Sequence, residues 1–376
     1  MKHIVRNLIV LGCVGSSAWA APFLAIGDNA ELFLTGSAGI RYDDNILLAP
    51  SGPNKMSDGI LQFVPGIELD FGKDSAIKGM FTASETLSQY LDHDEFNTQL
   101  ASVAFKANYD NEKTSVATYG SYHQLDQNTY AANGTSVRRD VSTLGVNGEY
   151  AVSQKTSFGA GFSFSRTEYL QNGYTGEKDY SVPLNAYYAI TPKVDLSAGL
   201  TYTRSDVDNG LSYDDYYYNI GARGEFTPKL TGNFSIGFDD RSASGSPTAQ
   251  DNSGLSFHGG LSYLYSPKTT FTFNADKGFT NSAASGSTQK NLSFSLGGQT
   301  QLAPDWKANA GITYRQIEYQ GLARTDDYVE GTIGATYIIN ANFSVNGSYI
   351  YRENTSDAAS AEFKNNVVAL SVSARY

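Results

Sequence analysis

Arginine is the residue in this chain best suited to bind an anion, because its planar guanidinium pairs with carboxylate or phosphate through two parallel hydrogen bonds. Six arginines recur at a similar distance after a tight turn: Arg41, Arg166, Arg204, Arg241, Arg315 and Arg352. Residue alternation predicts that Arg41, Arg241, Arg315 and Arg352 lie on a polar face and are candidates for guiding an anionic solute. The alternatives are pairing with nearby acids and, for Arg166 and Arg204, contact with lipid phosphates.

Acidic residues occur as doublets in the connections between apolar segments. The candidates for a cation shell are Asp43, Asp44, Asp214, Asp215, Asp326 and Asp327. Hard divalent cations prefer such oxygen ligands, but the spacing does not match an EF-hand loop. The simpler interpretation is a solvated acidic rim, and we assign no metal site.

Histidine and cysteine offer little for catalysis. The single cysteine, Cys13, lies near the N-terminus, and the later histidines are His93, His123 and His258. No acid follows His258 at a spacing typical of a catalytic pair, and His123 lies near Asp126 in the sequence without a third group to orient it. The chain has no Gly-rich phosphate loop. We therefore expect no catalytic residues, no cofactor and no enzymatic activity.

Apolar residues alternate with polar residues along most of the chain. Near the C-terminus Val368, Leu370 and Val372 alternate with Ser371 and Ser373. This two-residue period is typical of β-strands, whose successive side chains point to opposite faces. No segment after the N-terminal region shows the longer period of an amphipathic helix.

Two kinds of turn separate the alternating segments. Short turns such as Thr191-Pro192-Lys193 and Thr227-Pro228-Lys229 alternate strictly with longer acidic connections, such as residues 43–58 and 206–214. Proline, asparagine and aspartate favour tight turns. The pattern predicts an all-β fold: a transmembrane antiparallel up-and-down β-barrel of about 18 strands (16 as the alternative), with short periplasmic turns and longer extracellular loops.

The N-terminus has the pattern of an export signal. Lys2 and Arg6 precede a short apolar stretch, and Ala18-Trp19-Ala20 is a small-x-small cleavage site. The residues around Cys13 faintly resemble a lipoprotein site, which is the alternative. We expect a signal peptide over residues 1–20, a periplasmic segment over 21–30 and a barrel over 31–376. A net charge of −11 argues against a nucleic-acid partner.

The apolar face recurs in strand after strand, and this repetition indicates that lipid surrounds it. A sheet that spans a bilayer must close, because lipid cannot satisfy open strand edges. Aromatic residues at segment ends, such as Tyr150 and Trp306, suit the headgroup boundary, and the C-terminal Tyr376 resembles the assembly signal of outer-membrane barrels. We predict the bacterial outer membrane as the location, with a secreted β-helix or adhesin as the alternative.

The segment Gly39-Ile40-Arg41-Tyr42-Asp43-Asp44-Asn45-Ile46 resembles the N-terminal strand motif of a β-barrel porin family found in exopolysaccharide biosynthesis operons. The resemblance implies an outer-membrane pore for export of a secreted polysaccharide, and it transfers no catalytic residue. Expected partners are outer-membrane lipid and lipopolysaccharide, periplasmic chaperones, the barrel-assembly machinery and polysaccharide-export components.

Two other functions remain open at this point. The chain fits a passive diffusion porin for small hydrophilic solutes, or a structural or adhesive barrel without transport. General porins narrow their lumen with a loop of about 30 residues, whereas residues 43–58 form the longest connection here. The absence of such a loop favours a wide conduit or a lumen closed by a partner, with mixed wall charges and weak ion selectivity.

Overall fold

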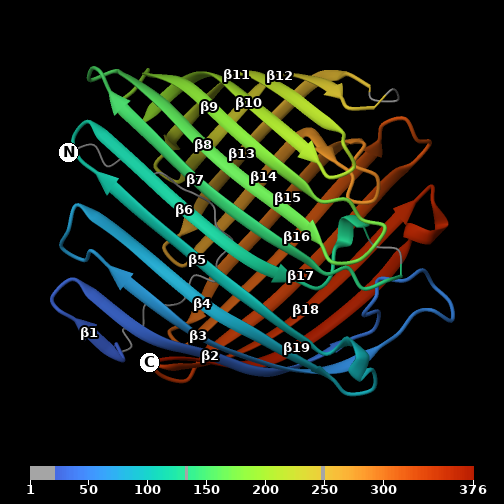
Figure 1. Cartoon of the computed structure of the whole chain (residues 1–376). Coiled ribbons are helices and arrows are strands. Elements are labelled where there is room, and N and C mark those ends of the chain that lie inside the picture. The colour runs from blue at the N-terminus through green and yellow to red at the C-terminus, as the bar shows by residue number, and fades with distance from the viewer. Residues whose placement is uncertain (1–21, 132–133, 247–249) are drawn as a thin grey trace.

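The computed structural model describes residues 22–131, 134–246 and 250–376. One antiparallel sheet closes on itself into a barrel (Figure 1), in which strands β2 to β19 form an 18-membered ring and the short strand β1 is added at one edge. The prediction of about 18 strands is confirmed. The predicted signal peptide, residues 1–20, lies outside the described residues.

The strands have nearly uniform length, as expected for a barrel wall. They are β1 (Leu24–Ile26), β2 (Ala30–Asp43), β3 (Asp58–Phe71), β4 (Ile77–Tyr90), β5 (Thr98–Asp110), β6 (Thr114–Leu125), β7 (Arg139–Ala151), β8 (Thr156–Tyr169), β9 (Glu177–Ala189), β10 (Val194–Val207), β11 (Ser212–Thr227), β12 (Leu230–Ser244), β13 (Asn252–Ser266), β14 (Thr269–Asn281), β15 (Thr288–Ala303), β16 (Trp306–Tyr319), β17 (Thr325–Ile338), β18 (Phe343–Ser356) and β19 (Phe363–Arg375).

The last strand closes the ring against the first. In β19, Val368 pairs with Tyr42 and Leu370 with Ile40 of β2. Beyond β19, the backbone of Tyr376 exchanges two hydrogen bonds with Leu34, of 2.6 and 2.9 Å. Strand β1 folds back onto the start of β2, where Leu24 lies opposite Leu32.

The described residues include three single-turn 3₁₀ helices, all in the longer connections: η1 (Asp94–Phe96), η2 (Thr129–Ala131) and η3 (Ala359–Ala361). Within the described ranges, no helix has the length and apolar character needed to cross a bilayer. The long connections gather at one end of the barrel, here called the mouth, and the short turns gather at the other, near the C-terminus (Figure 1).

Hydroxyl side chains close the short turns. Thr191 Oγ1 accepts hydrogen bonds from the backbone N–H groups of Lys193 and Val194, at 3.2 and 2.9 Å. Thr227 Oγ1 does the same for Lys229 and Leu230. These local bonds satisfy N–H groups that a tight turn leaves without strand partners, which explains the recurring Thr-Pro-Lys pattern.

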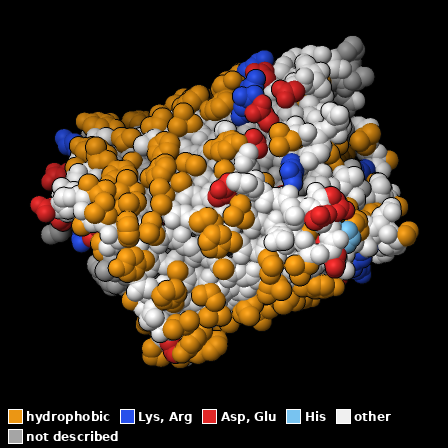
Figure 2. Space-filling model, turned by 60° about the horizontal axis from the view of Figure 1, so that its bottom comes forward, with side chains coloured by type: hydrophobic (Ala, Val, Ile, Leu, Met, Phe, Trp, Pro, Cys, Tyr) orange, Lys and Arg blue, Asp and Glu red, His pale blue; other side chains and the backbone are white. Residues whose placement is uncertain are grey.

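Alternation gives the wall an apolar outer surface and a polar inner surface. Exposed apolar side chains on the outside include Leu34, Ile40, Phe63, Phe162, Leu184, Ile220, Leu255, Ile312, Ile333 and Leu370. Figure 2 shows hydrophobic side chains across the outer surface, with charged side chains mainly toward the ends. Aromatic pairs such as Trp306–Tyr337, with ring centroids 5.0 Å apart, lie near the short turns. An apolar outer surface with aromatic residues near its ends is expected for a barrel that is surrounded by lipid.

Candidate functional site

The connection between β2 and β3, residues 44–57, folds into the mouth. Leu48 is 2% exposed and packs against Tyr328 and Phe363, which point inward from β17 and β19. Ile46 packs against the inward-facing Ile60 and Tyr90 of β3 and β4. This connection therefore covers part of the lumen, the space enclosed by the ring.

From the lengths of the connections, the sequence favours a wide conduit or a lumen closed by a partner, but the structure shows the β2–β3 connection packed against the inner wall. Length alone excluded a constricting loop, but the run Ile46-Leu47-Leu48-Ala49 supplies apolar side chains that are buried against the inner wall. Burial of a Leu or Ile side chain stabilises a structure by about 1.5–3 kcal/mol, which is sufficient to hold a short loop inward. This connection therefore narrows the mouth.

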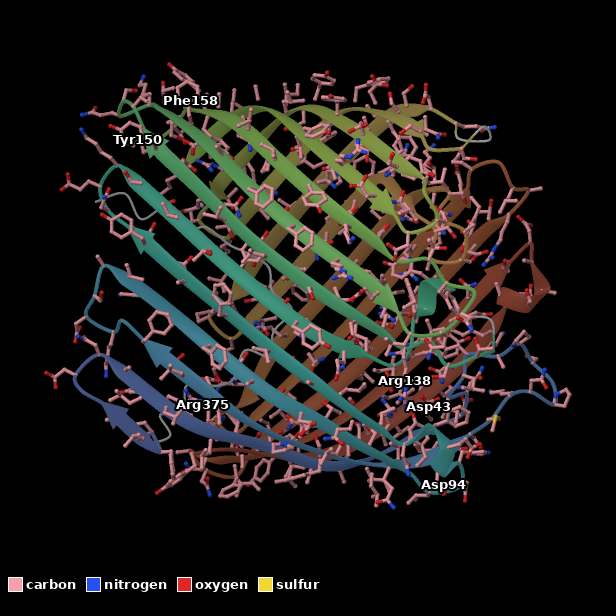
Figure 3. The ribbon with its side chains drawn as sticks, in the orientation of Figure 1. Asp43, Asp94, Arg138, Tyr150, Phe158 and Arg375 are labelled. Atoms are coloured by element: carbon pink, nitrogen blue, oxygen red, sulfur yellow. The ribbon has the colours of Figure 1, made fainter. Side chains whose placement is uncertain are left out.

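The motif Asp43-Asp44-Asn45 joins this loop to the seam between β2 and β19. Asp43 Oδ1 accepts hydrogen bonds from the Asn45 N–H at 2.9 Å and from Asn365 Nδ2 at 2.6 Å. Asn45, which is fully buried, donates from Nδ2 to the carbonyls of Ala49 and Lys364 and accepts from the Ala49 N–H. We call Asp43, Asp44, Asn45 and Asn365 the seam clasp. Figure 3 shows Asp43 at the mouth.

The connection between β6 and β7 crosses the mouth to the opposite wall. Tyr130 of η2 lies against Arg315 of β16, with the guanidinium carbon 3.5 Å from the ring centroid, and Tyr328 lies 4.4 Å from the same carbon. Because β6 and β16 lie on opposite sides of the ring, this contact spans the lumen. Gln127 Nε2 also donates to the carbonyl of Ile46 at 3.3 Å, which joins the two inward loops.

A third connection, residues 282–287 between β14 and β15, leans over β9 to β11. The carbonyl of Ala283 accepts from the Thr175 N–H at 2.7 Å, and that of Gly286 accepts from the Tyr213 hydroxyl at 2.9 Å. Asn209 Nδ2 donates to the carbonyl of Ser285 at 2.8 Å. Three separate connections therefore cover different parts of the mouth.

The four arginines predicted to guide a solute all lie on the inner surface, but in different surroundings. Arg241, 2% exposed, pairs with Asp215 at 2.6 Å. Arg352 pairs with Glu330 at 3.1 Å. Arg315 lies between two tyrosine rings, and among the described residues neither Arg315 nor Arg41 forms an ion pair. Their role as solute guides stays a prediction.

Strand order decides which of these arginines lie close together. Arg315, Arg352 and Arg41 belong to β16, β18 and β2, within five consecutive strands of the ring. Arg241 lies on β12, in another part of the wall. On the outer surface, Arg166 pairs with Glu168, and Arg204 pairs with Asp206 and Asp214. These two arginines face away from the lumen, as contact with lipid phosphates would require.

The acidic doublets are divided by strand alternation, because adjacent strand residues face opposite surfaces. Asp215 faces the lumen with Arg241, whereas Asp214 accepts from the outward Tyr202 hydroxyl. Asp326 pairs with Arg324 inside, whereas Asp327 accepts from the outward Tyr314 hydroxyl. The described residues contain no group of three or more potential metal ligands of the His, Cys, Asp and Glu types.

Each later histidine has one polar partner. His93 Nδ1 lies 3.0 Å from the buried Asp58 carboxylate, and His258 Nδ1 lies 3.3 Å from Asp276. His123 Nδ1 lies 2.8 Å from Ser102 Oγ on the inner surface. In the described part of the chain, no carboxylate is hydrogen-bonded to His123, so the Ser-His contact lacks the third group that would orient a catalytic base.

Two further arginines on the inner surface, Arg223 and Arg375, are paired with acidic residues. Near the short turns, Arg223 pairs with Glu149 at 2.7 Å and Asp195 at 3.1 Å and stacks 3.4 Å from the centroid of Tyr187. Arg375 pairs with Glu68 at 2.7 Å and stacks on the Phe33 ring (Figure 3). The sequence placed these charges on the inner wall but did not identify the aromatic partners.

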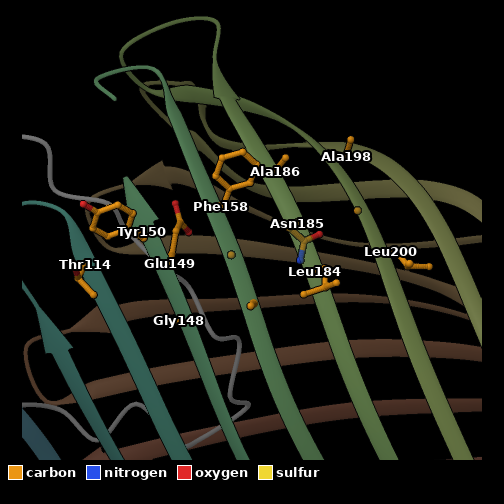
Figure 4. Close-up of a pocket in the computed structure, with 13 residues that line it drawn as sticks. Thr114, Gly148, Glu149, Tyr150, Phe158, Leu184, Asn185, Ala186, Ala198 and Leu200 are labelled. Carbon is orange, nitrogen blue, oxygen red and sulfur yellow. The ribbon is translucent and has the colours of Figure 1, made fainter. Parts of the chain in front are cut away.

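An apolar depression of about 700 Å³ lies on the outer surface of β7 to β10 (Figure 4). Tyr150, Phe158, Leu184 and Leu200 line it, with small residues between them. The apolar side chains that line the depression alternate along their strands with side chains that face the lumen. The depression therefore faces lipid and is separate from the lumen.

The seam clasp predicts a pH dependence through Asp44. Burial opposes ionisation of this carboxyl, but hydrogen bonds from the backbone and side chain of Asn366 and from Lys55 outweigh it and hold the pKa of Asp44 below its usual value of 3.8. A lowered pKa stabilises the fold above pH 3.8, and this stabilisation is lost as the pH falls through the lowered pKa. Asp44→Asn is therefore expected to destabilise the barrel at pH 7 by about 1 kcal/mol.

Thermal unfolding in detergent between pH 2 and 7 checks this expectation. The difference between the two proteins should shrink toward pH 2. Asp94→Asn, at an exposed aspartate of the β4–β5 connection, is the control and should change little. A difference between wild type and Asp44→Asn that is the same at pH 2 and 7 contradicts the prediction.

Comparison with known proteins finds one family model and several solved structures. Residues 211–376 match a family model described as "Putative beta-barrel porin 2". OccAB4 of Acinetobacter baumannii is 11% identical, with 93% of this chain and 98% of that chain covered and a TM-score of 0.49. OpdL of Pseudomonas aeruginosa is 12% identical, with coverage of 93% and 99% and a TM-score of 0.48.

A structure titled "Bacterial polysaccharide outer membrane secretin" is 10% identical, with coverage of 94% and 100% and a TM-score of 0.40. No curated protein matches the chain. The family match covers β11 to β19, and the resemblance at residues 39–46 spans the end of β2 and the start of the β2–β3 connection, so both meet at the β19–β2 seam. The C-terminal part of this 18-stranded barrel matches the β-barrel porin 2 family, consistent with a porin-like outer-membrane channel.

Proposed function

We propose that the protein is an outer-membrane conduit through which a secreted polysaccharide leaves the cell. The observation that carries the proposal is the polar inner surface of an 18-stranded ring, lined by Asn, Ser and Thr side chains and by paired charges. A ring of this size leaves space for water beyond its wall side chains. The resemblance at residues 39–46 adds the link to polysaccharide.

A passive diffusion porin is the second candidate, and the inward loops favour it. Residues 44–57 and the β6–β7 connection narrow the mouth, as a size-selecting pore requires. In this alternative, small hydrophilic solutes cross a permanently narrowed lumen. In the export conduit, the same loops move aside for a polymer.

The location and the partners that we propose follow from the class of outer-membrane β-barrels. We propose the outer membrane as the location, with lipid and lipopolysaccharide around the apolar wall. Tyr376, which is 59% exposed and lies beside Phe23, is proposed as the C-terminal signal read by the assembly machinery. Chaperones and polysaccharide-export components are proposed partners. We propose transport without a catalytic step.

A deletion strain distinguishes the candidate functions. Loss of surface polysaccharide with unchanged uptake of small solutes supports the export conduit. Reduced solute uptake with normal polysaccharide supports the diffusion porin and overturns export. If neither changes, transport is overturned and a structural or adhesive barrel remains. Conductance of the purified protein in a planar bilayer shows whether the lumen passes ions.

A further inference from the structure

An alternating row of glycine and asparagine crosses five neighbouring strands on the inner surface. Gly159 of β8 pairs with Asn185 of β9, which pairs with Gly199 of β10. Gly199 pairs with Asn219 of β11, which pairs with Gly237 of β12. Because directly opposite residues share a face, the row lies entirely on the lumen side.

The glycines make room for the amide side chains to lie along the wall. A Cβ added at Gly199 would collide with Asn185 Oδ1 and would lie 3.2 Å from Asn219 Nδ2. A Cβ at Gly161 would likewise collide with the Oδ1 atom of Asn147, which lies opposite on β7. The amides therefore occupy the space that a side chain at the glycine positions would fill. They lie along the wall and project less into the lumen than they would without the glycines.

These amides have unused hydrogen-bonding capacity. Among the described residues, the side chains of Asn147, Asn185 and Asn219 form no hydrogen bonds with the protein. Each amide offers two donor hydrogens and one acceptor oxygen without net charge. The row therefore presents neutral donors and acceptors to whatever fills the lumen.

A tyrosine ring adjoins the amides. Tyr119 of β6 lies opposite Gly145 of β7, where a Cβ would lie 2.7 Å from Tyr119 Cε1 and would also meet the end of the ring. The ring is thus held against the wall, as the amides are. An aromatic surface beside a few neutral polar groups is typical of sites that bind compact polar ligands with apolar faces.

We propose that the wall from β6 to β12, through Tyr119, Asn147, Asn185 and Asn219, binds a neutral, hydroxyl-rich sugar chain as it passes. A sugar hydroxyl both donates and accepts, as an amide does, and the C–H face of a sugar ring can cover Tyr119. The amide row carries no charge, and the nearby Arg223 is paired with Glu149 and Asp195. The inference rests on the proposed function in taking a saccharide as the solute.

Blocking of single-channel current by maltohexaose, a linear neutral glucan added on the short-turn side, tests the proposal. The double variant Asn185→Ala/Asn219→Ala loses two hydrogen-bonding side chains. The same degree of block should therefore require about tenfold more maltohexaose than in wild type. The open-channel current should stay close to that of wild type. Tyr119→Ala should also weaken block, whereas Tyr119→Phe, which keeps the ring, should not.

Asn346→Ala is the matched control. Asn346 also faces the lumen, but its amide accepts from Thr336 Oγ1 at 2.9 Å and donates to Ser373 Oγ at 3.0 Å. Block of the control should resemble that of wild type. Persistence of heat-modifiable mobility on gels shows that each variant is folded.

Three results would overturn the proposed sugar-binding site: no block of the wild-type channel by maltohexaose, equal block of wild type and the double variant, or a similar loss of block in Asn346→Ala. Stronger block by an oligogalacturonate, an anionic sugar, than by maltohexaose would overturn the inference that the site takes a neutral sugar. Failure of the proposed function is a separate result: a deletion strain that still exports polysaccharide overturns export but leaves a measured sugar site intact.

Discussion

Replacing Tyr130 by alanine is expected to raise the single-channel conductance severalfold. Tyr130 is the part of the β6–β7 connection that contacts the far wall, through the guanidinium of Arg315. Without its ring, the described residues of the connection keep one weak polar contact with Arg315, a 3.5 Å hydrogen bond from Arg315 Nη2 to Thr129 Oγ1. The loop should then leave the mouth for much of the time, and the narrowest cross-section should widen.

The size of the effect follows from the surroundings of Arg315. This side chain belongs to a residue only 8% exposed, and its Nε atom is buried without a hydrogen-bond partner in the described structure. A cation–π contact with a desolvated cation contributes about 2 kcal/mol. Losing it should shift the balance between closed and open loop positions about 30-fold.

Tyr130→Phe is the control, because it keeps the ring and should conduct like wild type. Arg315→Ala should open the mouth as Tyr130→Ala does, and combining the two should add little, because both remove the same contact. Single-channel recordings in a planar bilayer measure these conductances. Unchanged conductance in Tyr130→Ala would show that this contact does not hold the mouth closed.

The wall of the barrel could be predicted from the sequence because one local rule governs it. Alternation of residues such as Leu370 and Ser371 assigns each side chain to a face, and the alternation of short and long connections gives the number of strands. Even β6, whose two faces are mixed, spans Thr114–Leu125. These features depend only on neighbouring residues.

The mouth depends on contacts between distant residues, and these could not be predicted. Tyr130 meets Arg315 across 185 positions of the chain, and Asn45 meets Lys364 across 319. One local signal was present, since Ile46-Leu47-Leu48-Ala49 is an apolar run within a polar connection. Likewise, alternation predicted that Arg241 and Arg352 face inward, but not that Asp215 and Glu330 neutralise them.

The largest loss of stability is expected from Asn45→Ala. Asn45 is fully buried where the inward loop meets the seam between the first and last strands of the ring. Its side chain makes three hydrogen bonds, to the N–H and carbonyl of Ala49 and to the carbonyl of Lys364, at 2.8 to 3.0 Å. Alanine would leave buried backbone groups without partners, at a cost of about 1–3 kcal/mol for each unsatisfied group.

Unfolding of the purified protein in detergent, followed by its heat-modifiable gel mobility, measures this loss as a lower transition temperature. Lys364→Ala is the control: its exposed ammonium pairs with Glu353 across the neighbouring β18–β19 strand pair, and an exposed ion pair contributes about 0–1 kcal/mol. Because Asn45 also fixes the start of the inward loop, the variant should conduct more as well as unfold earlier. An Asn45→Ala protein as stable as Lys364→Ala would mean that the seam is held by its strand hydrogen bonds alone, and that the clasp serves only to position the loop.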